Sequence, residues 1–213
     1  MRPEQFLEQI RTSLHNPLPG IEAHKLLTPG KRPLIREEVP DIEEYRASAV
    51  AIVCYPVNNN VHSILIQRPD YNGNHGGQIS LPGGKAELDD VTMEYTARRE
   101  TEEEIGWKLS EEQYLGQLTE LFIPVSKFSV QPFLYFCEKP QPFIPDAREV
   151  AQIIQFPVVD LKNESIVKTT TIRVSSGMNL KDVPYFDINN HVVCGSTSEG
   201  RNVYGSQSCS AIG

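Results

Sequence analysis

Apolar stretches separated by polar turns predict several β-strands along this chain. The first two, residues 47–57 and 61–69, are rich in β-branched side chains and are separated by three asparagines, which tolerate the backbone of a tight turn. This pattern predicts a β-hairpin. The strands expected farther along are residues 114–124, 128–138 and 166–176. Pro132 has no N–H to donate to a neighbouring strand, so it indicates an edge strand or a bulge.

Residues 91–107 show the clearest helix pattern in the chain. Asp89 or Asp90 is expected to cap the start of this helix, and Gly106 is expected to end it, because glycine readily adopts the left-handed backbone found after a helix. The seam expected to face the core consists of Met93, Ala97, Thr101 and Ile105.

The first 45 residues read as an extension that packs on the core. An amphipathic helix with Phe6, Ile10 and Leu14 on one side is followed by a proline-rich, charged connection. This segment lacks the apolar centre of a signal peptide, and no run in the chain is apolar enough for a membrane span. We therefore expect a cytoplasmic protein with no membrane partner.

Composition narrows the class of protein. The chain has 213 residues, enough for one α/β domain with a sizeable core, and a net charge of −8, which argues against nucleic acid as the main partner. Its four cysteines form no C-x-x-C pair, so neither a zinc site nor a disulfide scaffold is indicated. Cys54 and Cys137 lie in apolar strands and are expected to be buried, inert thiols.

The sequence RRETEEEIGW, residues 98–107, concentrates glutamates within one stretch of the helix. Glu100, Glu103 and Glu104 share one ridge, whereas Glu102 is expected to face solvent. Three carboxylates placed together repel one another unless a cation lies between them, and they offer the oxygen ligands that Mg²⁺ or Mn²⁺ prefers. A solvated acidic face remains the alternative on the glutamates alone. Arg99, four residues before Glu103, is expected to pair with it.

The loop LPGGK precedes this helix. Pro82 is rigid, while Gly83 and Gly84 allow the backbone to approach a ligand closely and to offer N–H groups to phosphate oxygens. Lys85 is placed to meet either phosphate or solvent. A phosphate loop beside a metal site suits metal-assisted attack of water on a phosphoanhydride, with a glutamate taking the proton.

Gly84 followed by RETEEEIGW resembles the Nudix box, the signature of hydrolases that cleave nucleoside diphosphates linked to another moiety. The resemblance implies a mixed β-sheet sandwiched between helices, an α+β variant of the α/β class. It implies Glu100, Glu103 and Glu104 as metal ligands, with Glu100, Glu103 and Arg99 as the catalytic group. The general base is one of these glutamates or a glutamate from outside the helix. Thr101 replaces the usual apolar residue.

The interval from Gly84 to Arg99 is one position longer than in the general box, and Asp90 stands near the place of the first box glutamate. This longer form resembles the branch of the family that hydrolyses coenzyme A. The positions that match the run specific to that branch are Arg68, His75, Gly77, Gln78, Pro82, Gly83 and Gly84. The resemblance implies coenzyme A, or a derivative, cleaved to 3′,5′-ADP and phosphopantetheine. It ends near residue 195, because Cys194 replaces the tryptophan of the branch and a polar tail follows.

Individual residues of this region have two readings each. Arg68 is expected to bind substrate phosphate, the alternative being a surface ion pair with Asp70. Gln78 either holds the loop or contacts the ligand, and His75 is either a base or a donor that fixes the loop. Glu149 is either an extra carboxylate for the site or an exposed charge.

The sequence therefore predicts an N-terminal extension over residues 1–45, a Nudix hydrolase domain over 46–193 and a polar tail over 194–213. The expected partner is a small nucleotide substrate resembling coenzyme A, and a homodimer is left open. Two alternatives remain. One is a Nudix hydrolase of ADP-ribose, dinucleotides or nucleoside triphosphates, and the other is a Nudix-like module that binds a nucleotide without cleaving it.

Overall fold

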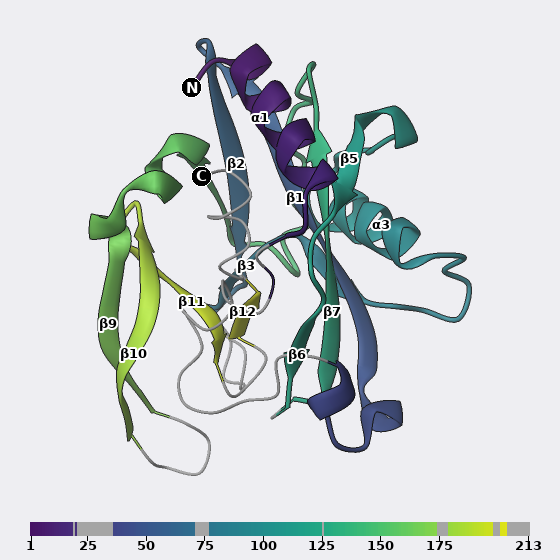
Figure 1. The fold of residues 1–213 in the computed structure, drawn as a ribbon, viewed down its shortest axis with the longest axis vertical. Helices are drawn as coiled ribbons and strands as arrows, with labels where there is room; N and C mark the ends of the chain where they lie inside the picture. Colours follow the sequence, from purple (N-terminus) through teal and green to yellow (C-terminus); the bar gives the residue numbers. More distant parts are fainter. Residues whose placement is uncertain are drawn as a thin grey trace.

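A computed structural model describes residues 1–18, 20, 36–70, 77–124, 126–173, 179–197 and 201–203 of the chain. Within these ranges no helix is both long and apolar enough to cross a membrane. Figure 1 shows one large sheet with a helix on each side of it and a smaller, separate sheet near the C-terminal end of the chain.

The predicted β-hairpin is confirmed. Strand β1 (Arg46–Val57) pairs antiparallel with β2 (Asn60–Gln67), and the pairing ends with Val57 opposite Asn60. Asn58 and Asn59 make the two-residue turn with φ angles of 46° and 63°. Asparagine tolerates this left-handed backbone better than most residues, which explains why asparagines occupy the turn.

The large sheet is mixed. Its main order is β3-β2-β1-β7-β5, with β4 also paired to β1, β6 to β7 and β8 to β2. The pairing of β1 with β7 is parallel, and the other pairings in this sheet are antiparallel. The remaining strands of this sheet are β3 (Ile79–Ser80), β4 (Gly83–Lys85), β5 (Tyr114–Gln117), β6 (Leu121–Ile123), β7 (Phe128–Phe136) and β8 (Gln152–Pro157).

Of the two alternatives predicted at Pro132, an edge strand or a bulge, the edge strand is wrong. Pro132 lies in β7, which is inside the sheet, between β1 on one side and β5 and β6 on the other. On the antiparallel side, β6 pairs with β7 up to Val130 and β5 pairs with it from Phe133 onward. Pro132 therefore occupies the point where the partner strand changes, and its carbonyl still accepts a hydrogen bond from the Leu118 N–H.

Helices α1 (Pro3–His15) and α3 (Met93–Ile105) cover opposite faces of the sheet (Figure 1). Strand β1 supplies alternate residues to the two cores. One core contains Ile52 and Cys54 of β1 with Phe6 and Ile10 of α1, and the other contains Ala49, Ala51 and Val53 of β1 with Ala97 and Ile105 of α3. Each large side chain that is fully buried in this way contributes about 1.5–3 kcal/mol to folding.

The predicted end of helix α3 is confirmed, but the residue predicted to cap its start is wrong. Gly106 follows its last turn with φ of 77°, as predicted. The predicted cap at Asp89 or Asp90 is wrong, because Thr92 caps the helix and its hydroxyl accepts the Tyr95 N–H. Asp90 instead turns its carboxylate toward Arg99.

The smaller sheet has the order β12-β11-β10-β9. Its strands are β9 (Val167–Arg173), β10 (Asn179–Ile188), β11 (His191–Thr197) and β12 (Arg201–Val203). Phe186, Ile188 and Val193 of this sheet are buried in the same core as α1. Strand β11 runs past residue 194, where the sequence predicts the start of a polar tail.

Short 3₁₀ turns complete the described structure. They are η1 (Arg36–Glu38), η2 (Ile42–Glu44), η3 (Glu111–Gln113), η4 (Val158–Lys162) and η5 (Glu164–Ile166). The two thiols predicted to be inert, Cys54 and Cys137, are both free and buried. Burial raises the pKa of Cys137 to about 12 and raises that of Cys54 as well, so neither is a thiolate near neutral pH.

Candidate active site

The site begins where the backbone of β4 crosses beneath α3. Gly83 has a φ of 151°, and a Cβ placed on it would lie 2.3 Å from the carbonyl oxygen of Ala49. Only glycine fits there, because the backbone conformation and the close neighbour both exclude a side chain. This close approach holds the loop against β1 and directs the Gly83 N–H toward the last turn of α3.

Glu104 is the most unusual side chain at this junction. Its side chain is 1% exposed, and its Oε2 accepts the Gly83 N–H at 2.8 Å. Its Oε1 has no hydrogen-bond donor among the described residues, and the nearest cation, the Arg68 Nη2, is 3.7 Å away. A carboxylate in the last turn of a helix also faces the negative end of the helix dipole.

Burial raises the pKa of Glu104 to about 8. The Gly83 N–H and Arg68 act in the opposite direction, while the nearby carboxylates of Glu100 and Glu149 raise the pKa further. The fold therefore keeps a carboxyl group where it is costly to ionise and leaves one of its oxygens without a hydrogen bond. A divalent cation would compensate both effects.

Glu100 lies directly over Gly84. A Cβ on Gly84 would lie 2.4 Å from the Glu100 carboxylate carbon, so the second glycine of the loop makes room for this side chain. Glu100 is 14% exposed, and burial raises its pKa although the Arg99 guanidinium lowers it in part. Two carboxylates, Glu100 and Glu104, thus converge on the double glycine.

Arg99 joins the loop to the helix. Its Nε and Nη2 donate to the two oxygens of Asp90 at 2.9 and 3.0 Å, and Nη2 also donates to the Lys85 carbonyl at 3.2 Å. Its Nη1 lies 3.0 Å from both Glu100 and Glu103, so the predicted pairing with Glu103 is confirmed. With this many acceptors, Arg99 has little capacity left for a ligand.

Asp90 is held from several sides. Besides Arg99, its Oδ2 accepts the Glu87 N–H and the Thr96 hydroxyl, both at 2.9 Å. The hydrogen bonds from Arg99 hold the pKa of Asp90 well below its usual range. Asp90 therefore organises the loop between β4 and α3.

The three glutamates of the predicted ridge differ in exposure. Glu104 is buried, Glu100 is mostly buried, and Glu103 is 55% exposed. Glu102 faces solvent, as predicted, and pairs with Lys108 at 3.1 Å.

Within the described ranges, no group of three acidic, histidine or cysteine side chains is already arranged to hold a metal ion. The reason is visible in the contacts, because Arg99 Nη1 occupies the space between Glu100 and Glu103. Asp90 holds Arg99 through its other nitrogens, Nε and Nη2. The carboxylate oxygens and the unpaired Glu104 Oε1 are donors suited to Mg²⁺ or Mn²⁺.

The predicted substrate residues lie on the same edge. The Arg68 side chain faces Glu104, and no ion pair with Asp70 is found in the described part of the chain. The Arg68 N–H donates to the Gln78 carbonyl at 2.8 Å, which brings Gln78 to this edge. The Lys85 side chain is exposed next to the loop. His75 lies outside the described residues, so its prediction stays untested.

A segment that the sequence did not indicate fastens Glu149 near the site. The Ile144 N–H donates to the Ile105 carbonyl at 2.9 Å and the Asp146 N–H to the Glu104 carbonyl at 3.1 Å, which caps the end of α3. Asp146 then accepts the Glu149 N–H at 2.9 Å. Glu149 is exposed, and its charge raises the pKa of Glu100 and Glu104.

The protein-family comparison is decisive at this point, because the model of the NUDIX domain matches residues 46–172. This chain belongs to the NUDIX family. The matched residues contain the whole loop and helix described above, so the Nudix box is the candidate active site. The fold class and the family expected from the sequence are therefore confirmed.

Curated relatives agree with this assignment. The proteins named NudL, uncharacterized Nudix hydrolases of Yersinia pestis and Yersinia pseudotuberculosis, are each 34% identical over 112 residues. Those residues cover 53% of this chain and 54% of the relatives, so the chain spans about half the length of the curated relatives it matches.

A solved structure supports the fold alone. A MutT/nudix family protein from Enterococcus faecalis superposes with a TM-score of 0.50 at 17% identity. The superposition covers 82% of this chain and 62% of that one. It extends the structural likeness beyond the residues that the family model matches.

Proposed function

We propose that this Nudix domain is a metal-dependent hydrolase that cleaves the phosphoanhydride of a nucleoside diphosphate linked to another group. The observation that carries the proposal is the Glu104 carboxyl, which is buried beside the double glycine with one oxygen lacking a hydrogen bond. Buried carboxylates that lack a hydrogen-bond partner are uncommon in folded proteins, and strongly shifted pKa values concentrate at functional sites.

Glu100, Glu103 and Glu104 would hold Mg²⁺ or Mn²⁺. The metal, when bound, neutralises phosphate charge and lowers the pKa of a coordinated water. Arg99 acts as a positioning residue in this proposal, because Asp90 and the Lys85 carbonyl hold it while it orients Glu100 and Glu103.

An anionic substrate needs cations in a chain whose net charge is −8. Arg68 supplies one, since its side chain is 32% exposed and lies beside Glu104. Lys85 is an exposed second cation next to the glycine loop. These two residues would hold substrate phosphates from opposite ends of the loop, while Gly83 and Gly84 allow the substrate to approach the backbone.

Glu149 is the proton acceptor that the arrangement favours. It comes from outside α3, its side chain is exposed, and no described cation forms an ion pair with it. Its charge acts on both Glu100 and Glu104, and in this proposal it accepts the proton of the attacking water. In the proposed site neither the metal nor Arg99 binds Glu149, so it is better suited to accept a proton than the glutamates of the box.

Within this reaction class we propose coenzyme A or a derivative as the substrate, with 3′,5′-ADP and phosphopantetheine as products. Support comes from the run that includes Arg68, Gln78 and the double glycine, whose two halves are joined by the hydrogen bond from the Arg68 N–H to the Gln78 carbonyl. The cytoplasmic location and a homodimer remain predictions.

Chromatographic product analysis tests this proposal. The protein is incubated with coenzyme A, ADP-ribose or diadenosine polyphosphate in separate tubes, each with Mn²⁺ and with EDTA. Metal-dependent release of 3′,5′-ADP from coenzyme A is the expected result. Cleavage of another substrate alone would keep the reaction class and reject coenzyme A. A fourth tube holds a nucleoside triphosphate, and no cleavage in any tube would reject the hydrolase in favour of a module that binds a nucleotide without cleaving it.

A further inference from the structure

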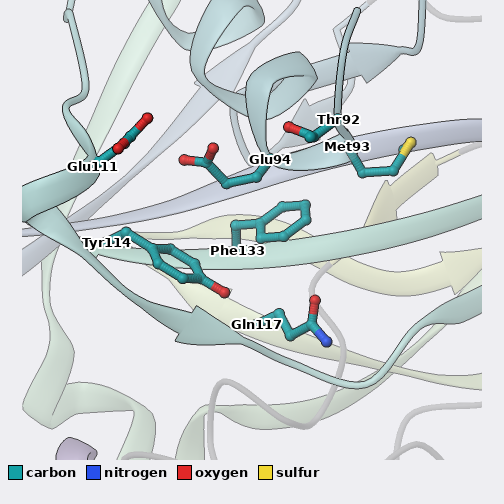
Figure 2. Close-up of a pocket in the computed structure, with 7 residues that line it drawn as sticks. All are labelled: Thr92, Met93, Glu94, Glu111, Tyr114, Gln117 and Phe133. Carbon is teal, nitrogen blue, oxygen red and sulfur yellow. The ribbon is translucent and has the colours of Figure 1, made fainter.

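A second hollow lies at the start of α3, well away from the box. It has a volume of about 480 Å³ and is bounded by the first turn of α3, by η3 and by strands β5 and β7 (Figure 2). Glu94, which lines it, precedes Glu104 by ten residues, or about 15 Å along the helix axis. The hollow is therefore a separate place from the double glycine and its carboxylates.

Aromatic rings form one side of this hollow. Tyr114 and Phe133 line it, with ring centroids 6.3 Å apart, and Tyr135 lies behind Tyr114 with a centroid distance of 5.8 Å. Tyr114 is 37% exposed although it is a large aromatic side chain. The faces of such rings carry partial negative charge, so they attract cations as well as apolar groups.

Two carboxylates complete the hollow. Figure 2 shows the Glu94 carboxylate pointing toward Glu111, with the Tyr114 and Phe133 rings below them in the view. Glu94 accepts the Tyr135 hydroxyl at 2.7 Å and lies 3.4 Å from Arg98, so one positive charge already offsets it. Glu111 is exposed and forms no ion pair with any described residue.

The lining of the hollow lacks positive charge, because none of the described residues that bound it is a lysine or an arginine. A phosphate would meet two carboxylates and the negative faces of two rings, so the hollow disfavours nucleotides. The hollow favours a cation with an apolar body, because the rings and the Glu111 carboxylate both attract it.

We propose that this hollow binds a small organic monocation, an ammonium or amidinium group carried on an apolar or aromatic body. The charged group lies between the Tyr114 ring and Glu111, and the apolar body packs on Phe133 and Met93. Gln117 and Thr92 offer hydrogen-bonding groups at the rim. The proposal stands apart from the hydrolase function, because it requires neither metal nor substrate.

Benzamidine and benzamide provide a matched pair of probes. Both are flat, aromatic and nearly the same size, but only benzamidine carries a positive charge. Binding is measured by isothermal titration calorimetry at low salt in the presence of EDTA. We expect benzamidine to bind the full chain and benzamide to bind at least tenfold more weakly or not at all.

Variants locate the site. Glu111→Gln removes the unpaired charge while keeping the backbone hydrogen bond that the Glu111 carbonyl makes, and Tyr114→Ala removes the ring. Glu112→Gln is the control, because Glu112 is the exposed neighbour and does not line the hollow. We expect affinity for benzamidine to fall about fivefold in Glu111→Gln and about tenfold in Tyr114→Ala, and to stay unchanged in Glu112→Gln.

Three results would overturn the proposal. They are the absence of benzamidine binding to the unaltered chain, equal binding of benzamide, and unchanged binding in Glu111→Gln and Tyr114→Ala. Circular dichroism of each variant establishes that it is folded before binding is compared. Since no readout depends on catalysis, these results leave the proposed hydrolase untouched.

Discussion

The two ends of α3 each carry a partly or fully buried glutamate, and the fold treats them differently. Glu94 lies in the first turn, where the helix dipole favours a negative charge, and it is held by the Tyr135 hydroxyl and by Arg98. Glu104 lies in the last turn, where the dipole opposes its charge, and one of its oxygens has no hydrogen bond. The same residue type is satisfied at one end and left unsatisfied at the other.

We interpret this difference as one between a charge that stabilises the fold and a charge that serves the proposed metal site. The contacts of Glu94 stabilise the helix start and tie it to β7. Ionised Glu104 lowers the stability of the fold. Its carboxylate lies at Gly83, and the carboxylate of Glu100 lies at Gly84. We infer that the C-terminal end of α3 lowers the free energy of unfolding of the domain, and that this loss of stability accompanies metal binding there.

Glu104→Gln should have the largest effect. We expect kcat to fall about a thousandfold, because a neutral amide cannot replace the charge that would hold the metal in the proposed site. The stability of this variant, in contrast, should not fall near pH 8. The folded-state pKa of Glu104 is raised from 4.5 to about 8, so its contribution to stability is present below pH 4.5 and is lost as the pH rises toward 8.

The Glu104→Gln variant lacks this loss and should unfold at a temperature no lower than the unaltered chain at pH 8. Calorimetric scans at pH 5 and pH 8, compared with rates on the identified substrate, measure both effects. A variant that keeps its activity, or that is strongly destabilised at pH 8, would show that Glu104 is structural.

Gly84→Ala should come next. The added methyl group would overlap the Glu100 carboxylate, which must move away from the site. Since the displaced atoms are the end of a flexible side chain, the fold should remain intact while kcat falls about a hundredfold. Steady-state kinetics with circular dichroism measure this. Gly83→Ala is the contrasting variant, because its methyl group meets the Ala49 backbone, and it should fail to fold stably.

Asp90→Asn should lower the free energy of unfolding by about 2–3 kcal/mol near neutral pH, because it weakens the charged hydrogen bonds that hold Arg99. The folded-state pKa of Asp90 is depressed, so its contribution is present above the unfolded pKa of about 3.9 and is lost as the pH falls below that value. Urea unfolding at pH 7 and at pH 3 should therefore show a difference between the two proteins that shrinks in acid. A difference independent of pH would contradict the ionic role.

Glu102→Gln should have the smallest effect. Glu102 is exposed and its only ion pair in the described structure is with Lys108, which is also exposed. Exposed pairs contribute about 0.2–1 kcal/mol, so stability should change by less than about 1 kcal/mol and kcat by less than twofold. A large loss of activity in this variant would mean that charge anywhere on the helix matters, which would remove the distinction drawn from Glu104.

The parts of the fold that depend only on residues adjacent in the sequence could be predicted from it. The turn at Asn58 and Asn59 and the end of α3 at Gly106 follow from local backbone preferences. The cap of α3 could not, because Asp90 is drawn to Arg99, nine residues away, and Thr92 takes its place. Pro132 misled for a similar reason, since the change of partner strand beside it depends on how β5 and β6 are arranged.

The sequence could predict which glutamates share one ridge of α3, but not how deeply each of them is buried. Helical spacing places Glu100, Glu103 and Glu104 on one ridge, but only packing on the sheet determines that Glu104 is buried and Glu103 is exposed. The turn at Asp146, whose carbonyl accepts the Glu149 N–H, has no periodic pattern, because it is defined by backbone hydrogen bonds to α3. Long-range contacts of this kind leave little trace in a single sequence.

The central claim is that the unsatisfied Glu104 carboxyl is part of a metal site, and Mn²⁺ binding tests it most directly. Electron paramagnetic resonance of free Mn²⁺ measures the dissociation constant for the unaltered chain, for Glu104→Gln and for the control Glu102→Gln. We predict equal binding by the unaltered chain and Glu102→Gln, with affinity at least tenfold weaker in Glu104→Gln. Equal affinity in all three proteins would contradict the claim.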